Sequence, residues 1–388
     1  MKVVISAGGR FHAHQLANQL IKRNALGAFF TFDYTSVDRK KIPPHYVHCI
    51  KRCKIMNDAF VALQLGRVWD KSRFNVFKDT MFDRCVSKQL NWIEPFDLFV
   101  GWAHYAGTSI TAARKAGARI IIESGSCHIQ VQQKLLQQEY ERWGVPFQPI
   151  HAQTVEKMIN EYNQADYIMT LSSFAHDSFI TQGFVPTKVL KVPCGMNVEY
   201  FSDDKNYIQK KDKFRVIFVG LVTLRKGIHY LLQAWHELHL PLKDTELVIV
   251  GALQKDFAAI KQNLPIDSNI IFVGPVSRER LKALYQQSSL FVLPSIEDGF
   301  GMVIGEAMAS KLPVVCTTNT AAPEIIIDGS HGFLVPPQSI DMLAEKIQWC
   351  YQHQEEASEM GLLGYERIQD FTWDVYGQNV YNVYEGLL

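Results

Sequence analysis

A chain of 388 residues is too long for one ordinary domain, and at roughly 150 residues a domain it predicts two or three. Apolar residues make up 47% and charged residues 20%, which excludes a disordered chain and allows sizeable cores. The net charge of +1 excludes a uniformly basic nucleic-acid binder, although residues 1–193 carry +9 and residues 194–388 carry −8.

Short apolar runs typical of buried strands recur through the first half of the chain. Val, Ile and Phe follow one another in them without polar alternation, as in strands that are covered on both faces. The first run is too short for a signal peptide and leads into the glycine turn Gly8-Gly9. The predicted strands of this half are residues 3–7, 28–32, 97–103, 119–123 and 167–171, with a first helix at 14–23.

Residues 34–93 interrupt this pattern with Lys and Arg mixed among aromatic residues. Residues 1–93 hold 16 basic against 6 acidic side chains. The favoured interpretation is a helical insertion with a solvated basic face and an aromatic core face, because packing easily explains the aromatic residues. The alternative is an amphipathic surface for anionic lipid or a charged acceptor. The aromatic residues include Trp69, Phe74, Phe77, Phe82 and Trp92.

The alternation of strands and helices starts again after residues 191–201, which show no clear period and contain Pro193 and Gly195. Strands that alternate with helices predict parallel sheets built from βαβ units. We therefore expect an α/β fold of two Rossmann-like domains with a hinge at residues 191–201. The second set of predicted strands is residues 214–220, 246–251, 270–274, 290–294 and 313–317.

The chain shows no sign of a membrane span, a disulfide framework or a metal site. Its apolar runs stay below the roughly 18 residues that a spanning helix needs. The seven cysteines are odd in number and scattered, without His or Cys partners at zinc spacing. We interpret them as reduced thiols packed inside a cytoplasmic protein.

The sequence PSIEDGFGMVIGEAMASKLPVV, residues 294–315, is the most informative stretch. A strand ends at its start, and a helix should begin near Gly301. Gly299 and Gly301 allow the backbone to approach a ligand closely, and the helix start offers unpaired N–H groups to phosphate oxygens. Asp298 and Glu306 could accept hydrogen bonds from ribose or sugar hydroxyls. The alternative is a solvated acidic loop beside a helix that packs tightly on the sheet.

This stretch resembles the donor-binding signature of glycosyltransferase family 4, whose members are retaining enzymes of the GT-B fold. FVGLVTLRKGIHYLLQAW (218–235) is similar to the family's phosphate-binding loop and following helix, and VPCGMNVEYF (192–201) to its hinge. FTWDVYGQNVYNVY (371–384) is similar to its returning C-terminal helix. The resemblance is strong over residues 190–388 and weak before them.

The resemblance implies a GT-B fold, in which two Rossmann-like domains with parallel sheets face a cleft. Residues 1–193 would form the acceptor-binding domain, with the basic insertion at 34–93. Residues 194–370 would form the nucleotide-sugar-binding domain, and residues 371–388 a helix that crosses back toward the first domain.

The resemblance also assigns donor-binding roles to residues of the second half. It implies that Glu306 holds the ribose hydroxyls, that Asp298 contacts the donor sugar, and that Arg225 and Lys226 neutralise the diphosphate. The family usually has Glu where this chain has Asp298, so the neighbouring Glu297 is also a candidate for the sugar contact. Further donor-binding positions are Gly299, Phe300, Gly301, Met302, Val303, Gly274 and Pro275.

The first half offers acceptor-side candidates at the ends of its strands, where ligands of open α/β sheets bind. Many relatives have a His-Gly pair after the strand that matches residues 119–123, whereas this chain has Glu123-Ser124-Gly125-Ser126-Cys127-His128, which is similar to a subset of the family. We interpret Glu123 and His128 as candidate catalytic residues, with Ser126 beside them. An equally weighted alternative is that His128 caps the next helix. Gly8, Gly9 and His104 are further candidates for binding the acceptor or the diphosphate.

Together these features predict a hexosyltransferase-type, retaining glycosyltransferase of surface polysaccharide or glycan biosynthesis. It would move a sugar from a nucleotide-diphosphate sugar to a saccharide or lipid-linked acceptor, without a cofactor or metal and without nucleic acid. The basic first half predicts an anionic acceptor or peripheral contact with the inner face of an anionic membrane. Two other classes stay open. One is a GT-B enzyme of another reaction, such as a nucleotide-sugar epimerase, and the other is a non-catalytic nucleotide-sugar-binding subunit, which the altered motifs of the first half make credible.

Overall fold

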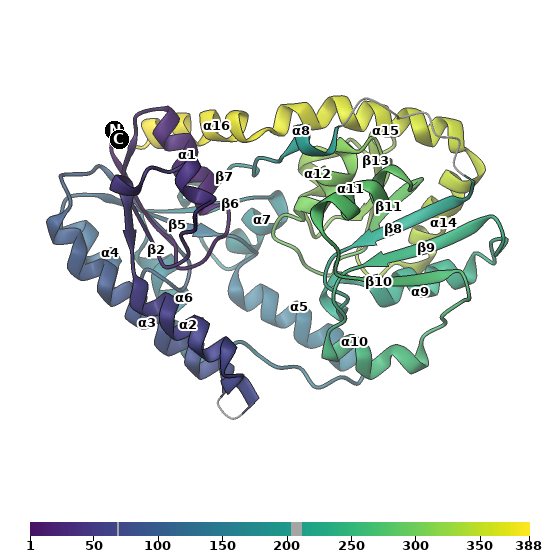
Figure 1. The fold of residues 1–388 in the computed structure, drawn as a ribbon, viewed down its shortest axis with the longest axis horizontal. Coiled ribbons are helices and arrows are strands. Elements are labelled where there is room, and N and C mark those ends of the chain that lie inside the picture. Colours follow the sequence, from purple (N-terminus) through teal and green to yellow (C-terminus); the bar gives the residue numbers. More distant parts are fainter. Residues whose placement is uncertain (68–69, 203–211) are drawn as a thin grey trace.

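The computed structural model describes residues 1–67, 70–202 and 212–388, and it contains two α/β units, each built around one parallel sheet (Figure 1). The first sheet has seven strands in the order β3-β2-β1-β4-β5-β6-β7, and the second has six in the order β10-β9-β8-β11-β12-β13. Every pair of neighbouring strands is parallel. This architecture confirms the predicted fold class of two Rossmann-like domains.

The seven-stranded sheet lies at the centre of the N-terminal core. Its middle strands are covered on both faces, which explains why Val3, Val4 and Ile5 are all 0% exposed. The strands are β1 (Val3–Ser6), β2 (Leu26–Thr31), β3 (Val47–Cys49), β4 (Leu98–Trp102), β5 (Arg119–Ser124), β6 (Tyr167–Thr170) and β7 (Val189–Lys191). The helices are α1 (Ala13–Lys22), α2 (Lys51–Ala62), α3 (Lys71–Gln89), α4 (Gly107–Lys115), α5 (Ile129–Arg142), α6 (Ala152–Gln164) and α7 (Ser173–Thr181).

The six-stranded sheet forms the C-terminal core in the same way. Its strands are β8 (Phe214–Val219), β9 (Thr245–Val250), β10 (Ile270–Gly274), β11 (Leu290–Leu293), β12 (Val314–Thr317) and β13 (Gly332–Val335). The helices are α8 (Val198–Phe201), α9 (Ile228–Glu237), α10 (Lys255–Ile260), α11 (Arg278–Gln286), α12 (Met302–Ala309), α13 (Ala322–Ile325), α14 (Ile340–Gln352), α15 (Gln354–Ile368) and α16 (Trp373–Gly386).

All ten strands that the sequence predicts are present, and three further strands, β3, β7 and β13, were not predicted. Each of the three is at an edge of its sheet and is only three or four residues long. An edge strand pairs with only one neighbouring strand and is less buried than a central one, so it can have fewer apolar residues. A search for apolar runs therefore misses it.

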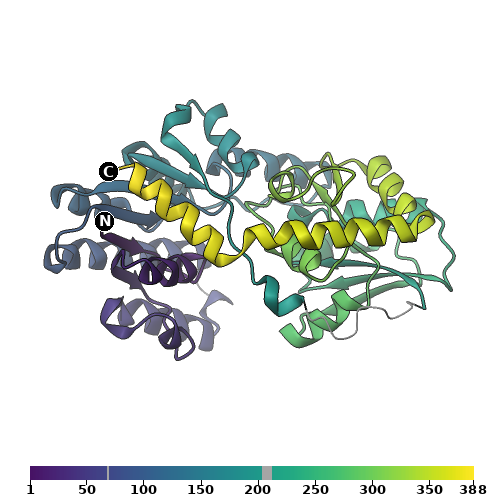
Figure 2. The same cartoon turned by 90° about the horizontal axis from the view of Figure 1, so that it is seen from above.

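The last helix, α16, leaves the C-terminal unit and returns along the N-terminal one (Figure 2). Tyr376, Val380 and Tyr384 are at most 2% exposed and belong to the N-terminal core. The helix also packs on α1, where Lys22 Nζ lies 2.5 Å from Asp374 Oδ1. The chain therefore crosses between the two units twice, at residues 191–201 and just before α16.

The two units contact each other closely beside these crossings. Glu139 of α5 and His229 of α9 are both 0% exposed, and Glu139 Oε1 lies 2.7 Å from His229 Nε2. Tyr140 donates a hydrogen bond of 2.6 Å to Asp256. A cavity of about 350 Å³ remains between the units, lined on one side by α1 and on the other by residues 196–200 and Arg278.

The basic insertion combines features of both interpretations of its sequence. Phe82 is fully buried and Phe74 stacks on Phe60 with 3.9 Å between ring centroids, as expected of an aromatic core. Phe77 and Trp92 are instead 61% and 88% exposed, and Trp69 lies outside the described residues. Across the described ranges, no helix combines the length and apolar character that a membrane crossing requires.

Candidate functional site

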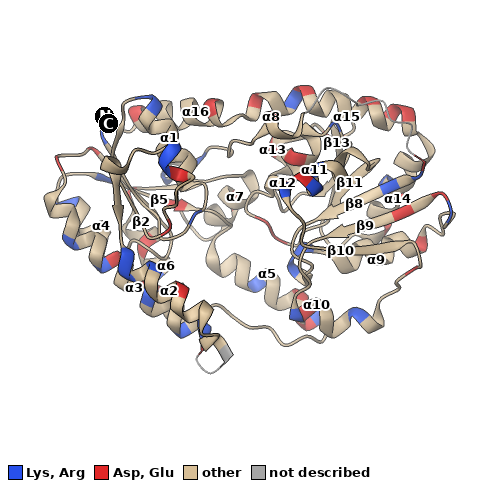
Figure 3. Ribbon diagram, in the orientation of Figure 1, with Lys and Arg blue, Asp and Glu red and all other residues tan. Residues whose placement is uncertain are grey.

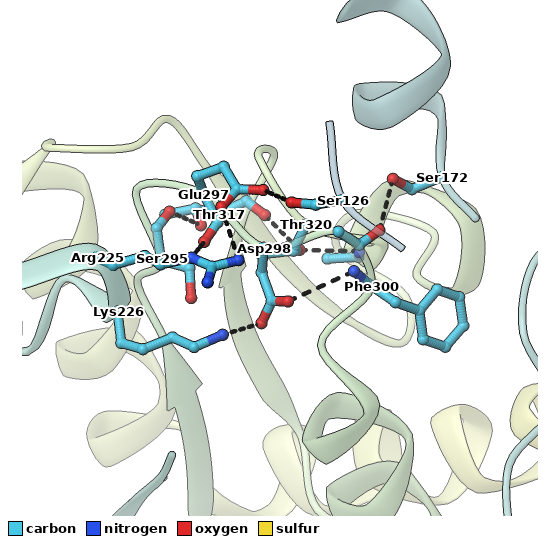
Figure 4. Close-up of polar contacts among 12 residues, drawn as sticks. Ser126, Ser172, Arg225, Lys226, Ser295, Glu297, Asp298, Phe300, Thr317 and Thr320 are labelled. Carbon is cyan, nitrogen blue, oxygen red and sulfur yellow. Dashed lines mark hydrogen bonds and ion pairs between the residues drawn. The ribbon is translucent and has the colours of Figure 1, made fainter. Parts of the chain in front are cut away.

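The loop between β11 and α12 carries the acidic signature and begins at the carboxyl end of its strand (Figure 4). Gly301 is the N-cap residue of α12 and has φ +79°, a left-handed conformation that suits glycine. No side chain caps α12. The N–H groups of Met302 and Val303 in its first turn therefore remain available to an anionic ligand, whereas that of Ile304 donates a hydrogen bond of 2.9 Å to the carbonyl of Gly301.

Two cations lie against this loop, as the sequence predicts. Arg225 and Lys226 follow β8, and Lys226 Nζ forms an ion pair with Asp298 Oδ2. Arg225 Nη2 lies 2.8 Å from Glu297 Oε2. Gly227 ends the cationic turn at φ +68°, and a Cβ there would lie 1.8 Å from the carbonyl oxygen of Pro294. Only glycine lets the cationic turn and the acidic loop pack this closely.

Asp298 and Glu297 differ in accessibility. The side chain of Asp298 is 15% exposed, whereas that of Glu297 is 0% exposed. Burial alone would raise the pKa of Asp298, but the charges of Lys226 and Arg225 outweigh it and hold this pKa below its usual value of 3.8. Asp298 is therefore an ionised carboxylate within reach of solvent.

Glu306 lies just past the middle of α12 and is partly exposed. Its Oε2 atom is 3.5 Å from the hydroxyl of Tyr285. Burial raises the pKa of Glu306, and the positive charge of Arg278 partly offsets this shift. Arg278 also lines the cavity between the two units. Glu306 therefore lies within electrostatic reach of a residue that lines this cavity.

Some of the remaining predicted donor-binding residues are already hydrogen-bonded or buried, and others are exposed. Ser172 donates a hydrogen bond of 3.0 Å to the carbonyl of Gly299, and the N–H of Ala321 donates one of 3.0 Å to the carbonyl of Phe300. The ring of Phe300 is buried. Met302 is 37% exposed and Val303 is partly exposed at the uncapped helix start. Gly274 ends β10 and Pro275 follows it at the same carboxyl edge of the sheet.

The sequence predicts that Gly299 leaves room for a ligand, but the N-terminal unit fills this room. A Cβ on Gly299 would lie 2.0 Å from the carbonyl oxygen of Gly125. Ser126 donates a hydrogen bond to Glu297 Oε1, and Gln132 donates one of 2.9 Å to Glu297 Oε2. Glu297 is therefore part of the contact between the units. No local sequence pattern predicts a role for Gln132, because its partner Glu297 is 165 positions away.

His128 occupies the N-cap position of α5. Its Nδ1 atom accepts a hydrogen bond of 3.3 Å from the N–H of Gln130, and the residue is 2% exposed. Its ring packs between Tyr162 and Phe179, and burial lowers its pKa to about 4. This geometry matches the capping alternative and corrects the interpretation of His128 as an acceptor-binding residue, because the ring is enclosed by aromatic side chains.

Glu123 is also enclosed. It is 0% exposed, and its Oε2 atom lies 3.3 Å from Nε2 of His12, which follows the glycine turn. The ring of His12 packs on Trp102. A ligand cannot reach the carboxylate of Glu123 past these side chains. Its interpretation as a catalytic residue is therefore corrected to a structural one, in which it holds the start of α1.

The glycine turn and His104 lie together at the ends of β1 and β4. A Cβ on Gly8 would lie 2.1 Å from the ring of Tyr105, so this ring already occupies the space beside Gly8. A Cβ on Gly9 would lie 2.9 Å from the ring of Phe11. His104 is different, because 27% of its side chain is exposed and its Nδ1 atom lies 3.1 Å from Asp79 Oδ2.

Metal binding finds no support in the residues that the structure describes, where no three His, Cys, Asp or Glu side chains gather as ligands. The seven cysteines are all free, and five of them are buried. The positive charge around the acidic loop comes instead from Arg225 and Lys226.

Comparisons with known sequences agree with this geometry. The sequence model of the family described as "Glycosyl transferases group 1" matches residues 201–367. The chain is 26% identical over 208 residues to the capsular polysaccharide biosynthesis glycosyltransferase CapM of Staphylococcus aureus, with 50% of this chain and 53% of CapM covered. It is 25% identical over 292 residues to a GDP-mannose-dependent alpha-(1-6)-phosphatidylinositol monomannoside mannosyltransferase of Mycolicibacterium smegmatis, covering 71% and 72%. The chain spans about half the length of CapM and of two further curated relatives.

Solved structures show the same fold. Anabaena Alr3699/HepE, in a crystal structure with UDP, is similar over 100% of both chains with a TM-score of 0.69 and 17% identity. The sucrose-phosphate synthase of Thermosynechococcus elongatus is similar over 100% of this chain and 99% of its own, with a TM-score of 0.70 and 19% identity. These likenesses confirm the predicted GT-B arrangement of two Rossmann-like domains.

Proposed function

We propose that this chain, of which residues 201–367 form a group 1 glycosyl transferase domain, moves a sugar from a nucleotide-diphosphate sugar to a saccharide or lipid-linked acceptor. The observation that carries the proposal is the contact of Arg225 and Lys226 with the acidic loop at the uncapped start of α12. This arrangement places positive charge and free N–H groups beside carboxylates that can bind hydroxyls, which is what a sugar nucleotide requires.

Each group has one role in the proposed transfer. Glu306 accepts hydrogen bonds from the ribose, and Asp298 accepts them from the donor sugar. Arg225, Lys226 and the start of α12 stabilise the diphosphate as negative charge develops on the leaving oxygen. All three sources of positive potential are fixed before the reaction, so little reorganisation is needed during it.

We propose that the transfer retains the configuration at the anomeric carbon. The bond from that carbon to the diphosphate oxygen breaks, the acceptor oxygen bonds to the same face, and the leaving phosphate takes the acceptor proton. No protein base is required in this scheme. This agrees with the enclosed positions of Glu123 and His128, which cannot reach an acceptor. We also propose that no metal is needed, since the two cations can neutralise the diphosphate, and transfer should then persist in EDTA.

A panel of nucleotide sugars, screened by thermal shift, tests the proposal because a tight ligand raises the unfolding temperature by mass action. The best ligand should then be hydrolysed slowly when water replaces the acceptor. Glu306→Ala should abolish turnover and weaken nucleotide binding in calorimetry, whereas Glu237→Ala, at an exposed position on α9, should change neither. Unchanged turnover in Glu306→Ala would refute the assignment.

The same experiment separates the two other classes. An epimerase would convert the sugar of the nucleotide sugar in the absence of any acceptor, which product analysis detects. A non-catalytic binding subunit would bind the nucleotide sugar without hydrolysing it. Only hydrolysis together with acceptor-dependent transfer supports the glycosyltransferase.

We further propose that the enzyme is cytoplasmic and contacts an anionic membrane through α2. Ile55, Val61 and Leu63 on and just after this helix are 66%, 68% and 69% exposed, and Lys51 and Arg52 are exposed in its first turn. Figure 3 shows Lys and Arg along α2 and α3. Apolar side chains beside basic ones suit an anionic lipid surface, where each basic residue contributes about 1 kcal/mol.

Vesicle flotation tests this contact. Binding should be seen with phosphatidylglycerol-containing vesicles at low salt and should weaken at high salt, because the Debye length shortens. Ile55→Asp together with Val61→Asp should reduce it. Absence of binding at low salt would remove the membrane contact and leave the transfer reaction untouched.

A further inference from the structure

A groove of about 500 Å³ in the N-terminal unit lies outside the donor site. One stripe of α3 forms one wall, the first turns of α6 form the other, and His104 after β4 contributes between them. Its volume falls within the roughly 300–1,000 Å³ of typical ligand sites. We call it the α3–α6 groove, and its lining includes Arg73, Phe77, Arg84, His104, Gln153 and Thr154.

The groove lies on the carboxyl edge of the N-terminal sheet. β4 leads into His104 and its neighbour β5 leads into the loop at Ser126 that contacts Glu297. In open parallel sheets, ligands bind at this edge. The loop after β4 therefore contributes His104 to the groove, and the loop after the adjacent strand β5 contacts the acidic loop of the C-terminal unit.

The spare positive charge in the α3–α6 groove belongs to two arginines. Lys157, which also lines it, lies 3.3 Å from the buried Asp83, so its charge is already balanced. Asp79 lies 3.1 Å from His104 and 3.7 Å from Lys78. Within the described part of the chain, Arg84 has no ion-pair partner, and the nearest carboxylate to Arg73 is that of the exposed Asp70 at 3.8 Å.

The two arginines flank an aromatic surface. Arg73 and Arg84 are about 16 Å apart along α3, at about 1.5 Å for each residue. Phe77 lies between them and is 61% exposed. An exposed ring with polar groups on the opposite wall, here Gln153 and Thr154, can hold the apolar face of a sugar while its hydroxyls are bonded.

His104 lines the groove, and one of its two ring nitrogens is held by a carboxylate. The carboxylate of Asp79 accepts a hydrogen bond from Nδ1, which leaves Nε2 as an acceptor for a hydroxyl. No described residue bonds Nε2. The backbone of His104 is left-handed at φ +66°, and Glu161 fixes it by accepting from the N–H groups of His104 at 2.5 Å and Ala106 at 2.8 Å.

We propose that the α3–α6 groove binds the acceptor, and that this acceptor is a saccharide with an anionic group. Arg84 holds the phosphate or carboxylate, the ring of Phe77 packs on a sugar, and Nε2 of His104 accepts a hydrogen bond from a hydroxyl. The inference rests on the proposed function only in calling the ligand an acceptor. Binding to the groove itself can be measured without any donor.

Three trisaccharide probes test the chemistry on the full chain: maltotriose, maltotriose 1-phosphate and trigalacturonic acid. Dissociation constants are measured by calorimetry at low salt without nucleotide. We expect one or both anionic probes to bind, and a stronger response to the phosphate or to the uronate identifies which anion the groove takes. Maltotriose should bind at least about tenfold more weakly, because it lacks a charge-assisted hydrogen bond.

Matched variants locate the binding. Arg84→Glu should weaken the anionic probes at least about tenfold, since it replaces attraction by repulsion. Lys243→Glu, on an exposed loop of the other unit, makes the same change in net charge and should have no effect. His104→Asn should weaken all saccharide probes, and asparagine tolerates the left-handed backbone. If Arg84→Glu unfolds at a lower temperature than the unmodified protein, Arg84→Gln replaces it in the binding measurements, because this substitution changes the charge less.

The inference is overturned if neither anionic probe binds more tightly than maltotriose, or if Arg84→Glu and Lys243→Glu weaken binding equally. Failure of the proposed function has a different signature. In that case the unmodified protein neither binds nor hydrolyses any nucleotide sugar, whatever the trisaccharides do.

Discussion

Two loops face each other across the contact between the units, residues 125–128 after β5 and residues 294–301 after β11. Each leaves the carboxyl end of a parallel strand and leads into a helix, and they meet where Ser126 bonds Glu297. The first loop uses its polar groups internally, since Glu123 before it and His128 at its end are both almost fully buried. The second keeps Asp298 and Glu306 accessible beside cations.

The comparison shows that a place at the carboxyl end of a parallel strand does not by itself make a loop available to a ligand. What differs is the partner of each carboxylate. Glu123 lies against His12 beneath α1, whereas Asp298 lies against Lys226 at an open edge. A diphosphate can share the cations of the second loop, but a ligand cannot displace the packing around the first.

The largest expected effect separates Asp298 from its neighbour. Asp298→Asn should lower turnover about 100-fold, because it removes a charge aligned with the developing positive sugar. Glu297→Gln should have a smaller effect on turnover but should lower the free energy of unfolding by about 1–3 kcal/mol, since it weakens buried hydrogen bonds between the units. Steady-state rates and thermal unfolding of both variants measure this. The reverse order would show that Glu297 is the sugar-binding carboxylate.

An effect of similar size, on binding and not on turnover, is expected from the cations that lie beside the second loop. Arg225→Gln combined with Lys226→Gln should raise the dissociation constant of a nucleoside diphosphate about 100-fold and leave that of the nucleoside nearly unchanged, because only the diphosphate loses charge-assisted bonds. Calorimetry with both ligands measures the difference. The matched control, Lys213→Gln with Lys243→Gln, removes two exposed lysines of the same unit. Equal losses for diphosphate and nucleoside would count against the cation role.

The smallest effect concerns the first loop and depends on pH. The pKa of His128 is about 4 in the folded protein and about 6.5 when unfolded, so the unfolded state takes up a proton first as the pH falls. His128 therefore costs about 2 kcal/mol of stability between pH 7 and pH 5. His128→Asn keeps a good N-cap and should be less sensitive to this change. Urea unfolding at the two pH values measures it, and identical losses in both proteins would contradict the buried, neutral histidine.

Much of the fold could be predicted because apolar runs mark central strands. β1, β5 and β11 each contain an unbroken, buried run of Val, Ile, Leu or Phe (VVI, III and LFVL), so their sequences alone identify them. The edge strands β3 and β7 have three residues each, and their pairing depends on neighbours far along the chain. No local pattern could reveal them.

The residues of the candidate site also differ in whether a local sequence pattern predicts them. Arg225, Lys226, Asp298 and Glu306 stand in a local sequence pattern, so they could be predicted together. The partners of Glu123 and Glu297 could not be predicted from the sequence. His12 is 111 positions from Glu123, and Gln132 is 165 positions from Glu297. Burial of this kind is a property of tertiary packing, and spacing in the sequence does not encode it.

The docking of α16 on the first unit affects the order in which the protein can fold during synthesis. Domains generally fold from the N-terminus as they leave the ribosome. Here Tyr376, Val380 and Tyr384 complete the N-terminal core, yet they are translated after the whole six-stranded sheet. Until α16 has been translated, the apolar surface of the first unit on which it packs stays exposed to solvent. The second unit can therefore complete its core before the first unit does. Chaperones would meet the half-made chain at the surface that α16 later covers.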